Sequence, residues 1–149
     1  MEKEIFNDLD TGEKQEFLQM FTNREINKDD LIRSEGEKYK SGFYLLSGKI
    51  AVIKNSSSED IEVIEATKDD DIFFSFSSLI DSGMSLTTIK AKTSCTIAEI
   101  SDKEFFEFCQ KNPQIGVKIM QRSMNMLMRF LRNSDKKLTE MYKTLEEVL

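Results

Sequence analysis

The residues that could carry chemistry in this sequence are few, and one type is missing altogether. None of the 149 residues is a histidine, so there is no imidazole for a general base, a nucleophile relay or a zinc site. Two cysteines, Cys95 and Cys109, are too few for a disulfide framework or a thiolate zinc cage. We interpret each as a small core residue rather than a redox sensor or a haem ligand. No acid, base and nucleophile converge, so we predict no enzyme activity, no metal centre and no other cofactor.

A second set of candidates is a segment rich in phenylalanine and hydroxyl side chains. Its members are Phe73, Phe74, Ser75, Phe76, Ser77, Ser78, Met84, Thr87 and Thr88. This mixture would suit a pocket for an uncharged or aromatic effector. The phenylalanines could equally fill the interior of the fold and leave no room for a ligand.

A run of three acids, Asp69–Asp71, precedes that segment and resembles a trap for a divalent ion. In an extended chain, consecutive side chains point to alternating sides, so three neighbours do not converge on one ion. We therefore interpret the run as a solvated turn.

The composition is that of an ordinary globular protein, with 39% hydrophobic and 32% charged residues. The length suits one domain, residues 1–149. A net charge of −6 argues against a whole-molecule affinity for nucleic-acid phosphates. No apolar run has the length of a signal-peptide core or a membrane span, so we expect a cytoplasmic protein without a membrane partner.

The apolar pattern divides the chain into three parts. Residues 1–22 are expected to form a helical flap, with Thr11 capping the turn that leads into Glu13. Residues 24–100 show the alternation typical of strands. The clearest strands are 43–48, 49–54, 61–65, 86–91 and 95–100. Short strands joined by Gly and Ser turns predict a β-roll, barrel or sandwich, and the third part, residues 101–149, is helical.

The helical part carries clear start signals. Ser101 and Glu104 fit a capping box, in which each side chain satisfies a backbone donor of the other residue. Asn112 and Pro113 then predict the start of a second helix, with Asn112 as its cap.

From Val117 onward, apolar residues recur at alternating steps of three and four. The positions are Val117, Met120, Met124, Leu127, Leu131, Ser134, Leu138, Met141, Leu145 and Val148. A helix from Pro113 to Leu149 would be about 55 Å long and would outrun the β part. We therefore predict a self-associating coil and a homodimer, parallel or antiparallel. Met128 and Phe130 widen the stripe and indicate that its near half also touches the β part.

Basic residues fall on the outward positions of the same helix. They are Lys118, Arg122, Arg129, Arg132, Lys136 and Lys143. No aromatic side chains are interleaved with them and no recognition helix follows, so we interpret them as a solvated face and expect no nucleic-acid partner.

Four runs of sequence resemble the cyclic-nucleotide-binding domain family, which includes the catabolite activator regulators. They are Ser34–Glu37, Gly42–Ile50, Asp71–Ile80 and Ser85–Ala91. The resemblance implies a mainly β fold of the β-roll type with flanking helices and a long C-terminal dimerisation helix. It also implies a small-ligand pocket inside the roll and no catalysis.

The resemblance breaks at the positions that hold the cyclic phosphate. The family's glycine, glutamate and arginine positions carry Ser75, Phe76 and Ser85 here, and only Thr88 fits the base-contacting hydroxyl. A buried phosphate without a guanidinium loses charge-assisted hydrogen bonds. Lys90 or Lys92, or backbone donors of a short helix near residues 77–80, could compensate.

These observations favour a non-enzymatic ligand-sensing or regulatory domain with a degenerate phosphate pocket, in which cyclic AMP or GMP binding is weak or lost. The candidate ligand-binding residues are Ser75, Phe76, Ser77, Ser78, Ser85, Thr87 and Thr88. The candidate dimerisation residues are Met120, Met124, Leu127, Leu131, Leu138, Met141 and Leu145. The alternative is a ligand-free scaffold with a plugged roll that dimerises and docks a protein partner.

Overall fold

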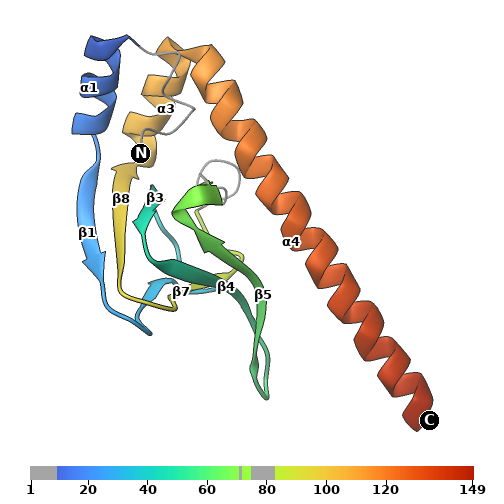
Figure 1. Ribbon diagram of the computed structural model, residues 1–149. Helices are drawn as coiled ribbons and strands as arrows, with labels where there is room; N and C mark the ends of the chain where they lie inside the picture. The colour runs from blue at the N-terminus through green and yellow to red at the C-terminus, as the bar shows by residue number, and fades with distance from the viewer. Residues whose placement is uncertain (1–9, 71, 75–82) are drawn as a thin grey trace.

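The structure is a computed structural model that describes residues 10–70, 72–74 and 83–149. A rolled β body carries two short helices at one end, and one long helix crosses it and continues beyond it (Figure 1). None of the helices in the described ranges is long and apolar enough to cross a membrane.

The elements follow one another in an order that keeps the strands together. The helices are α1 (Thr11–Gln19), α3 (Asp102–Lys111) and α4 (Pro113–Val148), with a 3-10 turn, η2, at Lys68–Asp70. The strands are β1 (Thr22–Ile26), β2 (Leu31–Arg33), β3 (Ser41–Ser47), β4 (Lys49–Asn55), β5 (Asp60–Thr67), β6 (Phe73–Phe74), β7 (Thr88–Ala91) and β8 (Cys95–Ser101).

The strands form two antiparallel four-stranded sheets, ordered β1-β8-β3-β6 and β2-β7-β4-β5. They enclose one apolar core, whose fully buried members include Phe43, Ile50, Ala91 and Ile97. The mainly β fold with flanking helices is therefore confirmed. Strand β4 buries both of its faces from Ile50 to Ile53, because a sheet that rolls over itself leaves few half-exposed positions.

The tight connection between β3 and β4 depends on Gly48. Its backbone has a positive φ of 86°, which side-chain-bearing residues rarely adopt. A Cβ atom there would lie 2.4 Å from the carbonyl oxygen of Ser94. The turn therefore needs glycine both for its conformation and for its close approach to the chain before β8.

A second apolar cluster joins α1, α3 and the start of α4 to the outside of one sheet. It consists of Phe17, Tyr44, Phe73, Ile100, Phe105, Phe108, Ile115 and Ile119. Phe17 stacks on Phe108 with ring centroids 3.9 Å apart. Phe73 stacks on Phe105 in the same way, at 4.1 Å. The expected flap is thus packed on the body through its aromatic side chains, although residues 1–9 lie outside the described part.

The sequence predicted where the helices start, but it did not predict every capping residue correctly. The cap of α1 is Asp10, whose carboxylate accepts from the Glu13 N–H at 2.8 Å, so the assignment to Thr11 was wrong. Asn112 precedes α4 as expected, but its side chain makes no capping bond. Its amide instead donates to the Phe108 carbonyl and closes the end of α3.

The capping box of α3 is confirmed in its first half. The Ser101 hydroxyl accepts from the Glu104 N–H at 3.2 Å. The same hydroxyl donates to the Glu104 carboxylate at 3.1 Å, so the two side chains bond to each other.

Candidate functional site

The segment that leads into β7 is held by the loop between β2 and β3. The N–H of Gly36 donates to the Ser85 carbonyl, and the N–H of Ser85 donates to the Glu37 carbonyl, both at 2.8 Å. The Tyr39 N–H donates to the Gly83 carbonyl at the same distance. These bonds form a short two-stranded ladder that fixes Ser85 at the edge of the roll.

Two of the three candidate hydroxyls described in this segment already have partners inside the chain. Ser85 is buried, and its hydroxyl donates to the Thr87 carbonyl at 2.7 Å. Thr88 is also buried, and its Oγ1 accepts from the Glu35 N–H at 3.0 Å. The Ser85 proton is therefore committed to the backbone, while Thr88 keeps its own proton as a donor.

Glu35 and Lys54 form an ion pair beside the same segment. The Lys54 ammonium pairs with the Glu35 carboxylate and donates to the Leu86 carbonyl at 2.8 Å. The second carboxylate oxygen of Glu35 accepts from the Asn55 N–H at 3.0 Å. Burial raises the pKa of Glu35, but the bonds from Lys54 and Asn55 outweigh it and lower that pKa below its ordinary value. A cation thus lies next to residues 85–88, and a carboxylate of the chain neutralises it.

The two lysines that could have compensated for the missing arginine are in other ion pairs. Lys90 lies 3.8 Å from the Asp29 carboxylate. Lys92 lies 2.6 Å from Glu65 and 3.0 Å from Glu62, and the bonds to those carboxylates raise its pKa. Lys90 is directed to a carboxylate in the turn between β1 and β2, and Lys92 to exposed carboxylates on β5.

The phenylalanines separate to opposite sides of one sheet. Phe74 enters the core of the roll and stacks on Phe43 with centroids 5.0 Å apart, whereas Phe73 packs against α3. Met84 is 43% exposed. Ser75, Phe76, Ser77 and Ser78, and the short helix expected near them, lie outside the described residues.

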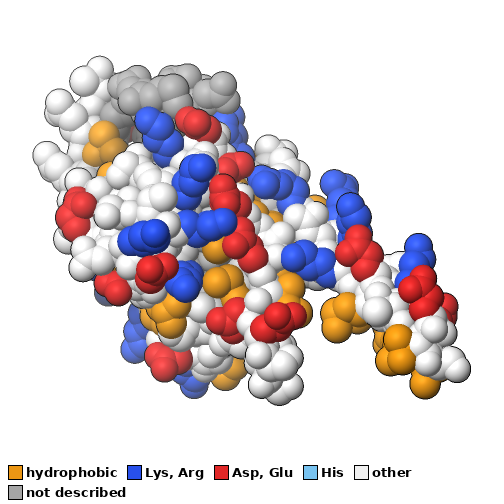
Figure 2. Space-filling model, turned by 60° about the horizontal axis from the view of Figure 1, so that its bottom comes forward, with side chains coloured by type: hydrophobic (Ala, Val, Ile, Leu, Met, Phe, Trp, Pro, Cys, Tyr) orange, Lys and Arg blue, Asp and Glu red, His pale blue; other side chains and the backbone are white. Residues whose placement is uncertain are grey.

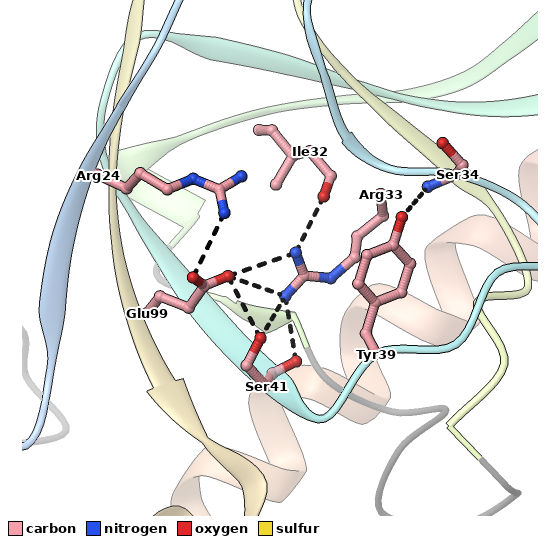
Figure 3. Close-up of polar contacts among 7 residues, drawn as sticks. All are labelled: Arg24, Ile32, Arg33, Ser34, Tyr39, Ser41 and Glu99. Atoms are coloured by element: carbon pink, nitrogen blue, oxygen red, sulfur yellow. Dashed lines mark hydrogen bonds and ion pairs between the residues drawn. The ribbon is translucent and has the colours of Figure 1, made fainter.

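A buried arginine that sequence reasoning missed is the last residue of β2, where the loop to β3 begins (Figure 3). Arg33 is only 6% exposed. Its guanidinium donates to the Ile32 carbonyl at 2.9 Å, to the Ser41 carbonyl at 3.1 Å and to the Glu99 carboxylate at 3.4 Å. Burial lowers the pKa of Arg33, and the Glu99 carboxylate opposes that change.

The Arg33 cluster positions the loop rather than a ligand. The ring of Tyr39 lies against the guanidinium, with its centroid 4.4 Å from Cζ. The Tyr39 hydroxyl accepts from the Ser34 N–H at 2.8 Å. The guanidinium bonds join the end of β2 to the start of β3 and to Glu99 of β8, so the cluster fixes both ends of the loop that holds Ser85. No local signal could have found it, because Glu99 lies on a strand far along the chain.

The cysteines and the acid run have structural roles. Cys95 is 1% exposed, and its thiol contacts the Lys49 carbonyl at 3.3 Å. Burial raises the pKa of Cys109 to about 11, which disfavours the reactive thiolate. Asp70 accepts from the Thr67 N–H and pairs with Arg129 of α4. No cluster of metal-ligating side chains occurs in the described ranges, and Asp71 is outside them.

Helix α4 has an inner stripe that packs on its own chain and an outer, apolar stripe that does not. The inner stripe consists of Ile115, Ile119, Ser123, Met126, Phe130, Asn133 and Lys137. Ile119 is buried, and Phe130 packs against the core of the roll as expected. The expectation for Met128 was wrong, because Met126 makes that contact and Met128 is 47% exposed.

The outer stripe is open to solvent along the helix except at Ser134, which is half-buried. It consists of Val117, Met120, Met124, Leu127, Leu131, Leu138, Met141, Leu145 and Val148. Their exposed fractions run from 36% at Leu127 to 79% at Val148. These include all seven residues assigned to dimerisation.

The far end of α4 forms one wall of a groove of about 500 Å³. The opposite wall is the β4–β5 hairpin, represented by Glu59 and Ile61. On the helix side the groove is lined by Lys137, Glu140, Met141, Thr144, Leu145 and Val148. Figure 2 shows this end of α4 standing away from the body, with hydrophobic side chains along the side that faces the gap.

The two antiparallel sheets roll around one core, and a long helix leaves the roll. This arrangement defines a β-roll domain with a long C-terminal helix. The sequence matches the profile of the Cyclic nucleotide-binding domain over residues 23–112, which is more than half of the chain. The chain belongs to this family.

Individual relatives agree with that assignment. The cAMP-activated global transcriptional regulator CRP of Salmonella typhimurium is 32% identical over 112 residues, or 74% of this chain and 50% of the relative. A cyclic nucleotide-binding domain from Methylobacillus flagellatus has a TM-score of 0.71 at 19% identity, covering 91% of this chain and 76% of that one.

A further similar fold is that of the c-di-GMP responsive global regulator CLP of Xanthomonas campestris. Its TM-score is 0.70 at 17% identity, covering 87% of this chain and 63% of that one. The chain spans about half the length of the curated relatives it matches. The relative CRP is named as a transcriptional regulator, which fits a regulatory role for the family.

Proposed function

We propose that this protein is a dimeric regulatory domain that senses a small ligand other than an ordinary cyclic AMP or GMP. The observation that carries the proposal is Ser85. It stands at the family's arginine position, is buried, and donates its only proton to the Thr87 carbonyl. A cyclic phosphate placed there would find neither a positive charge nor a free hydroxyl donor on this residue.

The charges around the segment support the same conclusion. Lys54 is bound to Glu35, Lys90 lies beside Asp29, and Lys92 lies between two glutamates. A phosphate would have to displace a carboxylate to reach any of these ammonium groups, and an unpaired anion in a largely apolar roll is costly. A ligand with little or no charge suits a hydroxyl donor such as Thr88 better.

Dimerisation through α4 is part of the proposal because the outer stripe keeps the a/d spacing of a coiled coil. Val117 and Met120 set the register, with a at 117 and d at 120. From Ile119 onward the inner stripe then falls at c and g, so the β body lies on the g side of its own helix. In an antiparallel pair the two g sides face each other, and both bodies would compete for the space beside the middle of the coil. In a parallel pair the two β bodies lie on opposite sides of the coil and do not compete for space, so we propose a parallel dimer.

One observation favours the scaffold as a second candidate. Phe74 stacks on Phe43 inside the roll, and Met126 and Phe130 pack on the same core from α4. A roll filled in this way would leave α4 and the body as a rigid dimeric platform for a protein partner.

Thermal unfolding with a panel of cyclic mononucleotides, cyclic dinucleotides and uncharged nucleosides distinguishes the candidates. We expect no shift with cyclic AMP or GMP and a rise of several degrees with one uncharged or less charged compound. A ligand at a hundred times its Kd adds about 2.7 kcal/mol to the free energy of unfolding. Thr88→Val should abolish that rise, whereas the exposed Thr22→Val should not. A clear shift with cyclic AMP would contradict the proposal, and no shift with any compound would favour the scaffold.

A further inference from the structure

The end of β4 directs two hydrogen-bond donors at one carboxylate. The Lys54 ammonium pairs with one oxygen of Glu35, and the Asn55 N–H donates to the other oxygen at 3.0 Å. An ammonium and a backbone N–H that converge on one group are donors that hold carboxylates and phosphates in proteins. The end of β4 therefore has the donors of an anion site, and a side chain of the same chain occupies it.

This anion site lies next to the segment that we assign to the ligand. The Lys54 ammonium also donates to the Leu86 carbonyl at 2.8 Å, and the Glu35 N–H donates to Thr88 Oγ1 at 3.0 Å. The side chains of Lys54 and Glu35 are 41% and 26% exposed, so solvent reaches both. A ligand that binds along residues 86–88 therefore comes within reach of the ammonium, but the Glu35 carboxylate is already bound to it.

Glu35 has an advantage over any external anion because the backbone already holds it in place. Its own N–H is bonded to Thr88, and the N–H of the next residue, Gly36, is bonded to the Ser85 carbonyl. A group held within the chain competes at a high effective concentration and loses little entropy when it binds. Its negative charge also repels a phosphate that approaches Lys54. A ligand without charge meets neither obstacle.

We propose that Glu35 determines the charge selectivity of this domain: its carboxylate occupies the anion site of Lys54 and Asn55 and excludes ligands that carry a phosphate there. The inference rests on the proposed function and names the group that rejects cyclic AMP and GMP. Ser85 supplies no charge at the family's arginine position, and Glu35 neutralises the nearby cation. Removal of the Glu35 carboxylate should therefore give the domain an affinity for phosphate.

Thermal unfolding of Glu35→Ala with inorganic phosphate and with cyclic AMP tests this role. The substitution removes the carboxylate and leaves the backbone bonds of the loop to Ser85 and Thr88 in place. Sodium chloride at the same ionic strength controls for screening. The matched control is Glu59→Ala, which removes an exposed carboxylate from the turn between β4 and β5.

Two further variants locate the effect. Glu35→Ala combined with Lys54→Met removes the ammonium and keeps an unbranched side chain at position 54. Glu35→Gln removes only the charge and keeps an oxygen that accepts from the Asn55 N–H. If Glu35→Ala does not fold, Glu35→Gln carries the test.

We expect the melting temperature of Glu35→Ala to rise by several degrees with cyclic AMP, with or without a rise in inorganic phosphate. The wild-type protein, Glu59→Ala and the double variant should show no rise. If neither Glu35 variant is stabilised, the inference is wrong and the proposed function stands, whereas a rise of the wild-type protein with cyclic AMP contradicts the proposed function itself.

Three other results would overturn the inference. An equal rise in Glu59→Ala would mean that the loss of any negative charge is sufficient. A rise in the double variant would mean that Lys54 does not hold the anion. A rise with inorganic phosphate but not with cyclic AMP would restrict the site to a free ion and remove Glu35 from nucleotide selectivity.

Discussion

The two halves of α4 have the same apolar spacing but opposite surroundings. In the first half, Ile115, Ile119 and Ser123 are buried, and the Ser123 hydroxyl donates to the Phe73 carbonyl of β6. In the second half, every residue from Leu138 to Leu149 is exposed. Polar side chains mark the boundary, since Asn133 donates to the Val63 carbonyl and Lys137 donates to the Glu62 carbonyl.

This difference shows that a helical period identifies an apolar face without identifying what covers it. The first half lies across the β body, which buries one stripe and leaves the outer stripe free. The second half lies beyond the body and retains only the outer stripe. Substitutions in the first half should therefore change the stability of the fold, and those in the second half should change the association of two chains.

The largest expected effect is that of Ile119→Ala in the first half. Ile119 is 1% exposed and packs in the cluster that joins α3 and α4 to the sheet. Removing most of a buried isoleucine should lower the free energy of unfolding by about 3 kcal/mol. Urea unfolding followed by circular dichroism at a fixed protein concentration would measure it. Gln121→Ala, an exposed neighbour, should stay within about 0.5 kcal/mol, and equal losses would mean that the inner stripe does not anchor the helix.

The next effect is that of Leu145→Glu in the second half. A carboxylate in the outer stripe would be buried without a partner in the coil, so the dimer Kd should rise by about a hundredfold. The unfolding of the β body should change little, because Leu145 is 53% exposed in the single chain. Light scattering over a range of concentrations would measure the association. Thr139→Glu adds the same charge on the outward face, and an equal loss there would contradict the assignment of the seam.

The fold was predictable from the sequence wherever the signal was local. Alternation, glycine turns and the Ser101 and Pro113 start signals placed β3, β4, β5, β8 and both C-terminal helices. Strands β1 and β2 were not identified one by one, because they are short and β1 is polar and mostly exposed. The caps at Thr11 and Asn112 were assigned wrongly because a hydroxyl or amide can bond in several directions, and packing decides among them.

The site was less predictable because its contacts join distant parts of the chain. The sequence pointed to Ser85 and Thr88, but their partners, Thr87 and Glu35, appear only once the loop and β7 are paired. Arg33 was not singled out from the sequence, since its partner Glu99 lies 66 residues further along the chain. The contact with the β body was assigned to Met128 instead of Met126 for a different reason. The inner stripe, which touches the body, lies at a different angle around the helix from the outer stripe, whose apolar period is the clearest in the sequence.

The smallest effect would locate the boundary between the two halves. Strand β5 lies at the edge of its sheet, and the Asn133 amide donates to its Val63 carbonyl at 3.1 Å. Asn133→Ala should lower the free energy of unfolding by about 1 kcal/mol, because it leaves a partly buried carbonyl without this donor. Asn125→Ala, on the exposed face of the same helix, should change it by less than about 0.5 kcal/mol. If Asn133→Ala and Asn125→Ala have the same free energy of unfolding, the bond from Asn133 does not anchor the helix. The first half of α4 would then end at Phe130, and the turn around Asn133 would belong to the second half.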